Sequence, residues 1–345
     1  MEKDNRIKIL NIISGSETGG AERFFERLSI SFSKNNLLEQ RVLIRNYSNR
    51  KNFLQENISQ IETIRFFNFF NPMLQQKLKK IFLEFKPNIV LSWMNRASSL
   101  LPVKRYNQEL KIGRLGGYYK LKNYAKCDYL ITNTDDLKRY VCDKGWDPNK
   151  VEVIPNFVDQ NIKKKKKKKT DRPLIVCLGR FHKNKGIDVL IKSMKFLENT
   201  DLNIVGRGNE LPNYKKLVKN LKLGDKISFF DWTDDISKYL NQADILVCPS
   251  IHEPFGNIII DAWAHQIPVI ASDVDGPSIL IQDKINGLKF ESKNHEQLSL
   301  KIKELIKNES LKIKITKNGL NLFKKKYSED IIVHKYVSFF RKILI

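Results

Sequence analysis

The 345-residue sequence has only four cysteines, no long apolar run and no histidine before His182. The cysteines are scattered without a Cys-x-x-Cys pair, which argues against a disulfide framework or a zinc site and favours a reducing compartment. Apolar stretches such as residues 258–260 fall far short of the ~18–20 residues that a membrane-spanning helix needs. The residues before Ile7 are too polar for a secretory signal. We therefore expect a cytoplasmic protein.

Positive charge is what the sequence has in excess, with 62 Lys and Arg against 38 Asp and Glu and a formal net charge of +24. Residues 1–160 hold 27 basic and 17 acidic side chains, and residues 171–345 hold 28 and 21. Such an excess favours anionic partners, whether nucleic acid, phosphorylated substrates or anionic lipid. The basic residues are dispersed and accompany no RNA-binding motif or zinc pattern, so a nucleic-acid binder is the least favoured alternative and we expect no nucleic-acid partner.

Short β-branched runs alternate with helical patterns along the chain. The first half opens with an apolar run at Ile7–Ile13, a polar loop with glycines, and a helical pattern over residues 21–32. Further strands are expected at residues 41–45, 88–92, 128–132, 151–154, 174–178, 202–205, 227–230, 245–248 and 269–271. This alternation predicts parallel sheets covered by helices on both faces.

Seven consecutive lysines, residues 163–169, interrupt the alternation. Because like charges repel and cannot pack, we interpret residues 161–171 as a linker. The expected fold class is α/β, with two Rossmann-like parallel-sheet domains, residues 1–160 and 172–326, that face a cleft. Residues 327–345 carry apolar side chains at helical spacing and are expected to form a closing helix that packs back toward the first domain.

Two of the expected strand-to-helix loops present groups that suit an anion, and open α/β sheets bind ligands at such loops. Gly19 and Gly20 precede a helix, whose free backbone N–H groups attract negative charge, although a glycine turn without a ligand fits equally well. Arg180 and Lys185 lie in the loop after residues 174–178. Two cations beside a helix start suit a diphosphate, with a solvated basic loop as the alternative.

A third loop, residues 249–257, carries Glu253 and leads into a helix on which Asp261 lies eight residues later. Carboxylates accept hydrogen bonds from hydroxyls, so two of them beside an anion site suit a ligand with sugars on either side of a diphosphate. In the alternative interpretation, Asp261 is a helix-face residue and Glu253 interacts with the helix dipole.

Six short motifs recur in a recognisable order across nearly the whole chain. They are Gly-Gly-Ala-Glu at 19–22, Ile-Pro-Asn-Phe-Val-Asp at 154–159, Gly-Arg at 179–180 with Lys-Gly at 185–186, Val-Gly-Arg-Gly at 205–208, Pro-Ser at 249–250 with Glu-Pro-Phe-Gly at 253–256, and Pro-Val-Ile-Ala-Ser at 268–272 with Gly-Leu at 287–288. In this combination the sequence resembles the retaining glycosyltransferases of family 4, which have the GT-B fold.

The resemblance implies transfer of a sugar, with retention, from a UDP- or GDP-linked donor to a hydroxyl of a glycan or lipid-linked acceptor in cell-envelope polysaccharide or lipopolysaccharide synthesis. It implies that Arg180 and Lys185 hold the diphosphate and that Glu253 touches the donor sugar. Asp261, where the family usually has Glu, would hold the ribose. The other implied donor-binding residues are Gly19, Gly20, Phe255, Gly256, Asn257 and Ile258. No cofactor or metal is implied, and a sugar-nucleotide epimerase of the same fold is the alternative.

The acceptor side departs from the family. Many relatives have a histidine in the loop after residues 88–92, whereas this chain has none, so Asn95 or Arg96 is expected to contact the acceptor instead. Arg114 and Tyr118 are expected to shape the acceptor pocket. Plain loops at a sheet edge explain each of these residues as well.

Residues 65–70 and 73–85 mix phenylalanines with lysines at 77, 79 and 80. This composition is typical of a helix that rests on an anionic membrane. Core-facing phenylalanines with a solvated lysine face are the simpler alternative. From the resemblance and this segment, we expect peripheral attachment to the inner face of the cytoplasmic membrane.

Overall fold

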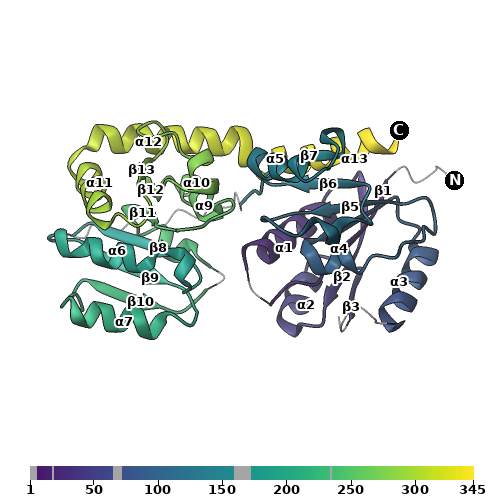
Figure 1. Cartoon of the computed structure of the whole chain (residues 1–345), viewed down its shortest axis with the longest axis horizontal. Coiled ribbons are helices and arrows are strands. Elements are labelled where there is room, and N and C mark those ends of the chain that lie inside the picture. Colours follow the sequence, from purple (N-terminus) through teal and green to yellow (C-terminus); the bar gives the residue numbers. More distant parts are fainter. Residues whose placement is uncertain (1–5, 18, 65–71, 159–171, 234) are drawn as a thin grey trace. The chain divides into compact units, whose positions relative to one another are not determined.

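The computed structural model describes residues 6–17, 19–64, 72–158, 172–233 and 235–345 (Figure 1). It divides into two compact units, Met1–Phe157 with Glu329–Ile345, and Val158–Ser328. Each unit is a parallel sheet with helices packed on it, which confirms the predicted α/β class. The expected linker, residues 161–171, and the phenylalanine-rich residues 65–70 lie outside the described residues.

The first unit contains a seven-stranded parallel sheet in the order β3-β2-β1-β4-β5-β6-β7. The strands are β1 Ile7–Ile13, β2 Leu38–Arg45, β3 Ile61–Ile64, β4 Ile89–Trp93, β5 Leu110–Arg114, β6 Tyr129–Thr132 and β7 Val151–Val153. The helices are α1 Gly20–Ser33, α2 Ser48–Gln55, α3 Pro72–Phe85, α4 Met94–Ser99, α5 Asp135–Asp143 and α13 Glu329–Leu344, with short 3-10 turns at Leu121–Tyr124 and Pro148–Lys150. The central strands are buried on both faces, which explains their runs of Ile, Val and Leu.

The last helix completes the core of the first unit. Tyr336 and Phe340 of α13 pack edge-on against Phe32 of α1, with ring centroids 5.5 and 6.0 Å apart. Edge-to-face aromatic pairs of this kind add to the stabilisation that burial provides. At the first turn of α13, Glu329 accepts a hydrogen bond of 2.7 Å from the Ser31 hydroxyl.

Arg114, at the end of β5, is buried among these elements and 2% exposed. Its Nε donates to the Tyr336 hydroxyl at 2.7 Å, and Nη2 donates to Asn156 Oδ1 at 2.6 Å. Nη1 donates to the Leu115 carbonyl at 3.1 Å, and the guanidinium lies 4.9 Å from the centroid of the Trp93 ring. The expectation that Arg114 lines an acceptor pocket is therefore wrong, because its nitrogen atoms are buried and bonded to protein.

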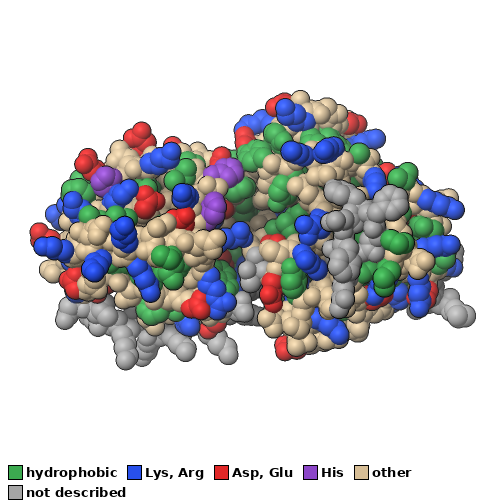
Figure 2. Space-filling view, turned by 60° about the horizontal axis from the view of Figure 1, so that its bottom comes forward, with side chains coloured by type: hydrophobic (Ala, Val, Ile, Leu, Met, Phe, Trp, Pro, Cys, Tyr) green, Lys and Arg blue, Asp and Glu red, His purple; other side chains and the backbone are tan. Residues whose placement is uncertain are grey.

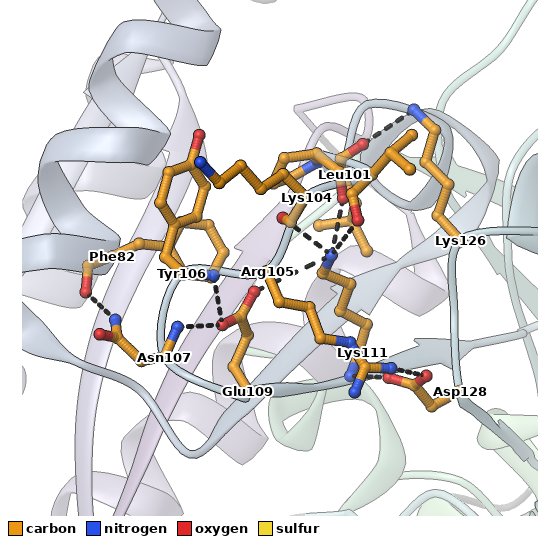
Figure 3. Close-up of polar contacts among 12 residues, drawn as sticks. Phe82, Leu101, Lys104, Arg105, Tyr106, Asn107, Glu109, Lys111, Lys126 and Asp128 are labelled. Atoms are coloured by element: carbon orange, nitrogen blue, oxygen red, sulfur yellow. Dashed lines mark hydrogen bonds and ion pairs between the residues drawn. The ribbon is translucent and has the colours of Figure 1, made fainter.

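A second group of buried charges lies at the opposite, amino edge of the first sheet (Figure 3). Lys111 of β5 is 1% exposed and donates to the Pro102 carbonyl at 2.7 Å and to the Val103 carbonyl at 3.3 Å. Burial lowers its pKa, which the charge of Glu109, 3.9 Å away, partly offsets. Lys126 holds the Ser99 and Leu101 carbonyls at 2.8 Å each. Two lysines thus fix the loop before β5, and we assign this cluster a structural role.

The second unit contains a six-stranded parallel sheet in the order β10-β9-β8-β11-β12-β13. Its strands are β8 Leu174–Leu178, β9 Asp201–Val205, β10 Ile227–Phe230, β11 Ile245–Cys248, β12 Val269–Ser272 and β13 Leu288–Phe290. Its helices are α6 Ile187–Ser193, α7 Leu211–Asn220, α8 Ser237–Leu240, α9 Asn257–Ala264, α10 Asp275–Leu280, α11 His295–Lys307 and α12 Glu309–Leu322, with 3-10 turns at Lys183–Lys185 and Met194–Phe196 and a π-helical turn at Phe323–Tyr327.

The predicted strands are all confirmed, with small changes at their ends, whereas β3, β5 and β13 were not expected. Residues of β3 are all half-buried, and its apolar run is interrupted by Glu62 and Thr63. Strand β5 contains Lys111 and Gly113, residues that are depleted from strands. Its place in the sheet is set by pairing with β4, which the local sequence does not reveal.

Helix α3 presents two different faces. Leu74, Leu78 and Phe82 are buried against the sheet, while Met73 and Leu83 are 75% and 50% exposed. Among the helices that the structure describes, none combines the length and apolar character that crossing a bilayer requires. Lysine and arginine side chains are dispersed over the face shown in Figure 2 and alternate with acidic ones.

We predict that Arg114→Met destabilises the first unit by about 3 kcal/mol, because it leaves several buried acceptors without a donor. Tyr336→Phe, the matched control, removes a single bond and should cost about 1 kcal/mol. Urea unfolding followed by circular dichroism measures both free energies. Equal losses in the two variants would contradict a central role for the guanidinium.

Candidate functional site

The site in the second unit is built where the strand order reverses. In the sheet, β9 lies on one side of β8 and β11 lies on the other. The loops that follow β8 and β11 therefore start from neighbouring strand ends and lead away in opposite directions. Gly186 ends the first loop with φ 57°, and a Cβ there would lie 2.1 Å from the Pro249 carbonyl oxygen of the second. The Asn184 carbonyl accepts a 2.7 Å hydrogen bond from the Ile251 N–H. Only glycine permits this approach.

An ion pair between Lys185 and Glu253 joins the two loops. Their side chains are 30% and 15% exposed, and the Ser250 hydroxyl donates to Glu253 at 3.4 Å. Burial would lower the pKa of Lys185, but the charge and hydrogen bond of Glu253 outweigh it, and the pKa lies above its ordinary value of 10.5. The exposed Arg180 is close enough to oppose this shift, so two cations stand together at the sheet edge.

Asp275, which the sequence did not single out, fixes Glu253 from a third loop. Its carboxylate accepts from the Glu253 N–H at 3.1 Å and pairs with the ring of His252. The N–H of Gly276 in turn donates to the Glu253 carbonyl at 3.0 Å. Asp275 has φ 33°, a left-handed conformation that strains a residue with a side chain and tends to occur at functional sites. The sequence signal that could have identified Asp275 is the polar Asp-x-Asp-Gly segment directly after β12.

The other predicted donor residues follow Glu253. Gly256 precedes α9 with φ 94°, so the turn into the helix needs glycine. Phe255 is buried, and Asn257 and Ile258 at the helix start are half-buried. Asp261 lies in the second turn of α9 and is 7% exposed. The structure thus gathers Lys185, Glu253 and the start of α9 on one sheet edge.

Two more loops reach the same edge after β9 and β10. Arg207 forms a two-point ion pair with Asp231, and the Trp232 N–H donates to Asp231 at 2.7 Å. Both charged side chains are about two-thirds exposed, at 68% and 66%, so this pair adds little stability. Its effect is to connect the ends of the two strands. The Phe181 N–H, bonded to the Arg207 carbonyl at 2.7 Å, extends the connection to the loop after β8.

The first unit has a similar edge at its own reversal point, between β1 and β4. Gly19 and Gly20 begin α1, and the segment before them lies beside Met94, which follows β4 with φ 60°. The Asn95 side chain is half-buried, and within the described residues its Oδ1 has no hydrogen-bond partner.

The remaining acceptor-side candidates differ in accessibility. Arg96 is exposed. Tyr118 donates to Asp136 and packs edge-on against Tyr140 at 5.2 Å, and its side chain is 37% exposed. Hence Arg96 and Tyr118 stay as predictions for the acceptor side.

No three His, Cys, Asp or Glu side chains gather as they would around a metal ion in the part of the chain that the structure describes. The two aspartates of the Asp-x-Asp segment have protein partners instead: Asp273 pairs with Lys289 at 3.0 Å, and Asp275 with His252.

The sequence and the fold were compared with known proteins. A family model described as Glycosyl transferases group 1 matches residues 158–322. The lipopolysaccharide core biosynthesis glycosyltransferase LpsE of Rhizobium meliloti is 30% identical over 327 residues, covering 92% of this chain and 95% of that protein.

Two solved structures share the fold over almost their entire length. A glycosyltransferase from Rickettsia africae has a TM-score of 0.83 at 21% identity and 99% coverage of both chains. Anabaena Alr3699/HepE in complex with UDP-glucose has a TM-score of 0.82 at 16% identity, covering 98% of this chain and 100% of that one. The two parallel α/β units are those of a GT-B glycosyltransferase. On the strength of the family model and of a relative that matches along nearly its full length, the chain belongs to the group 1 glycosyl transferases.

Proposed function

We propose that this glycosyltransferase moves a sugar from a UDP- or GDP-linked donor to a hydroxyl of a glycan or lipid-linked acceptor. The observation that carries the proposal is the Lys185–Glu253 pair, with Arg180 beside it, at the reversal point of the second sheet. Cations at that position suit a diphosphate, and a carboxylate next to them suits a sugar hydroxyl. The solved complex of HepE with UDP-glucose supports a donor of this class.

In this proposal, each donor group meets a residue of the second unit. Arg180 and Lys185 bind the diphosphate, and Glu253 accepts from the donor sugar. The ribose hydroxyls bond to Asp261, and the backbone of Gly256, Asn257 and Ile258, beside Phe255, faces phosphate and sugar. Gly19 and Gly20 contribute from the first unit. Asn95, Arg96 and Tyr118 contact the acceptor.

Catalysis then rests on charge stabilisation. As the bond from the anomeric carbon to the diphosphate breaks, negative charge grows on the leaving oxygen, and Lys185 and Arg180 stabilise it. Because Glu253 fixes Lys185 beforehand, little reorganisation accompanies the reaction. We propose retention, as in glycosyltransferase family 4: the acceptor hydroxyl attacks from the face that the diphosphate leaves, and the departing phosphate oxygen takes its proton. No enzymic nucleophile is required.

The biological role that we propose is synthesis of lipopolysaccharide or another envelope polysaccharide. LpsE, which is 30% identical, is a lipopolysaccharide core biosynthesis glycosyltransferase. CapM of Staphylococcus aureus, a capsular polysaccharide biosynthesis glycosyltransferase, is 28% identical over 183 residues.

We predict that Lys185→Met lowers donor turnover roughly 10²–10³-fold, because the leaving diphosphate loses a fixed cation. The donor is chosen by thermal shift from a panel of UDP- and GDP-sugars, and release of nucleoside diphosphate is measured with and without lipopolysaccharide-derived acceptors. Lys183→Met, an exposed lysine in the same loop, is the matched control and should keep full activity. Turnover by Lys185→Met within about threefold of wild type would refute the assignment. Conversion of the donor sugar without acceptor would indicate an epimerase.

The raised pKa of Lys185 leads to a pH prediction. A group whose pKa is raised on folding stays charged until the pH exceeds its ordinary value of 10.5, and the stability that it contributes is lost only above that. We therefore expect kcat/KM for the donor to show no fall due to Lys185 between about pH 7 and pH 9. Lys185→Arg, which stays charged throughout, should give a profile of the same shape. A fall in wild type that this variant abolishes would contradict the prediction.

We also propose that the exposed face of α3 contacts an anionic membrane surface. Met73 and Leu83 are apolar and exposed there, and Lys79 and Lys80 lie on the same face of the helix. Lys77 is half-buried and pairs with Glu62 at 3.0 Å, so it does not contribute. Lys80 lies 3.7 Å from Glu84 in an exposed pair, which adds little stability and leaves the lysine available to an anionic surface.

Sedimentation with vesicles of phosphatidylglycerol and phosphatidylcholine at about 50 mM salt tests this contact, since low salt preserves attraction between charges. The double variant Lys79→Glu with Lys80→Glu should lose most of the binding. A charge-matched control, Lys215→Glu with Lys219→Glu on α7, should retain it. Equal loss in both, or no binding by the wild type, would rule out a specific contact through α3.

A further inference from the structure

Residues 14–17, which follow β1 in the first unit, are held from two sides. On one side, Glu22 of α1 accepts from both the backbone N–H and the hydroxyl of Ser16, at 2.9 Å each. A Cβ at Gly15 would lie 2.5 Å from the same carboxylate oxygen, so a side chain there would displace Glu22. The segment is therefore packed tightly against the start of α1.

Arg50 holds the other side. It belongs to α2, and it is only 3% exposed. Its Nη2 donates to two successive carbonyls, Ser16 at 2.8 Å and Glu17 at 2.7 Å, while Nε donates to the Glu26 carboxylate at 2.7 Å. The neighbouring Asn49 amide donates to the Glu17 side chain at 2.8 Å. Two adjacent residues of α2 thus hold the segment.

These bonds set the direction in which the peptide groups point. In a trans peptide the carbonyl and the N–H point in opposite directions. Because the Ser16 carbonyl points at Arg50, the N–H of Glu17 must point to the opposite side. The N–H of Ser16 is already bonded to Glu22. Glu22 and Arg50 therefore fix the orientation of the two successive peptide groups that join Gly15, Ser16 and Glu17, shortly before Gly19 and Gly20.

The bonding pattern of Arg50 suits a role in orienting its partners. Burying a cation costs free energy unless all its donors are bonded, and within the described residues Nη1 of Arg50 is buried without a hydrogen-bond partner. An incompletely bonded buried charge is a poor choice for packing, but a guanidinium is well suited to orienting several acceptors at once.

We propose that Arg50 is a positioning residue that fixes the glycine-bearing loop of the first unit for substrate binding. The ordering of the loop stands on the contacts above. The effect of this ordering on the reaction rests on the proposed function, in which Gly19 and Gly20 contribute to the donor site.

Hydrogen exchange measures the ordering directly. The full-length variant Arg50→Ala should exchange the Ser16 amide, which is bonded to Glu22, about 10-fold faster or more than wild type. Arg45→Ala is the matched control. Arg50 and Arg45 both lie over the Tyr47 ring, at 5.7 and 5.2 Å, but Arg45 is bonded to neither loop carbonyl. Unchanged exchange in Arg50→Ala would overturn the proposal, and so would equal acceleration in Arg45→Ala.

Kinetics measures the consequence, using the donor that gives the largest thermal shift. Arg50→Ala and Arg50→Lys should each lower kcat/KM at least about 10-fold, since one ammonium cannot reach the carboxylate and two carbonyls together. Arg50→Lys keeps the charge and guards against simple loss of folding. Added methylguanidinium should restore part of the Arg50→Ala activity, which a merely structural defect would not allow.

The two proposals fail in different ways. If Lys185→Met is inactive while both Arg50 variants keep full activity, the positioning role is wrong and the proposed function stands. If Lys185→Met and the Arg50 variants all keep wild-type turnover, the assignment of the donor site is wrong. Arg50 then has no role in the reaction, even if its loss accelerates hydrogen exchange.

Discussion

The parallel arrangement of both sheets is the constraint from which the rest of the structure follows. Every strand pair in the two sheets is parallel, so each strand ends at the same edge, where its loop turns back into a helix. Chemistry-bearing residues far apart in sequence, such as Lys185 and Glu253, are brought together there by topology alone. The reversal of strand order then separates two neighbouring loops and leaves room for a ligand between their helices.

Each unit fixes its reversal point with a buried or half-buried acid–base pair. In the second unit it is Lys185 with Glu253, and in the first it is Arg50 with Glu26. Glycine allows a close approach beside each pair: Gly186 lies against the Pro249 carbonyl, and Gly15 lies against the Glu22 side chain. The acid–base pairs differ in accessibility, since the Lys185 side chain is partly exposed to solvent while Arg50 is buried behind its loop. This difference is why we assign direct contact to one and positioning to the other.

The sequence predicts the features that depend only on residues close together in the chain. Buried parallel strands, glycine turns and cations after a strand are visible as patterns, so the fold class and the loop holding Lys185 could be inferred. Asp275 and Arg50 could not, because their importance comes from partners on other elements that only the folded chain brings near. Arg114 was misassigned for the same reason. A charged residue beside glycines suggests an accessible loop, and the neighbouring sequence does not show that the Tyr336 hydroxyl, on α13, accepts a hydrogen bond from Arg114 Nε.

The bond between Arg114 and Tyr336 also bears on how the protein is made. Residues 329–345 emerge from the ribosome after the whole of the second unit, yet they supply Tyr336 and Phe340 to the core of the first. Until then, Phe32 has no α13 rings to pack against, and the Arg114 guanidinium lacks its tyrosine. The core of the first unit therefore stays incomplete, with part of its apolar surface uncovered, until residues 329–345 are available. The unit that begins first is completed last, and a chain that stops short of residue 329 would leave that surface open to aggregation.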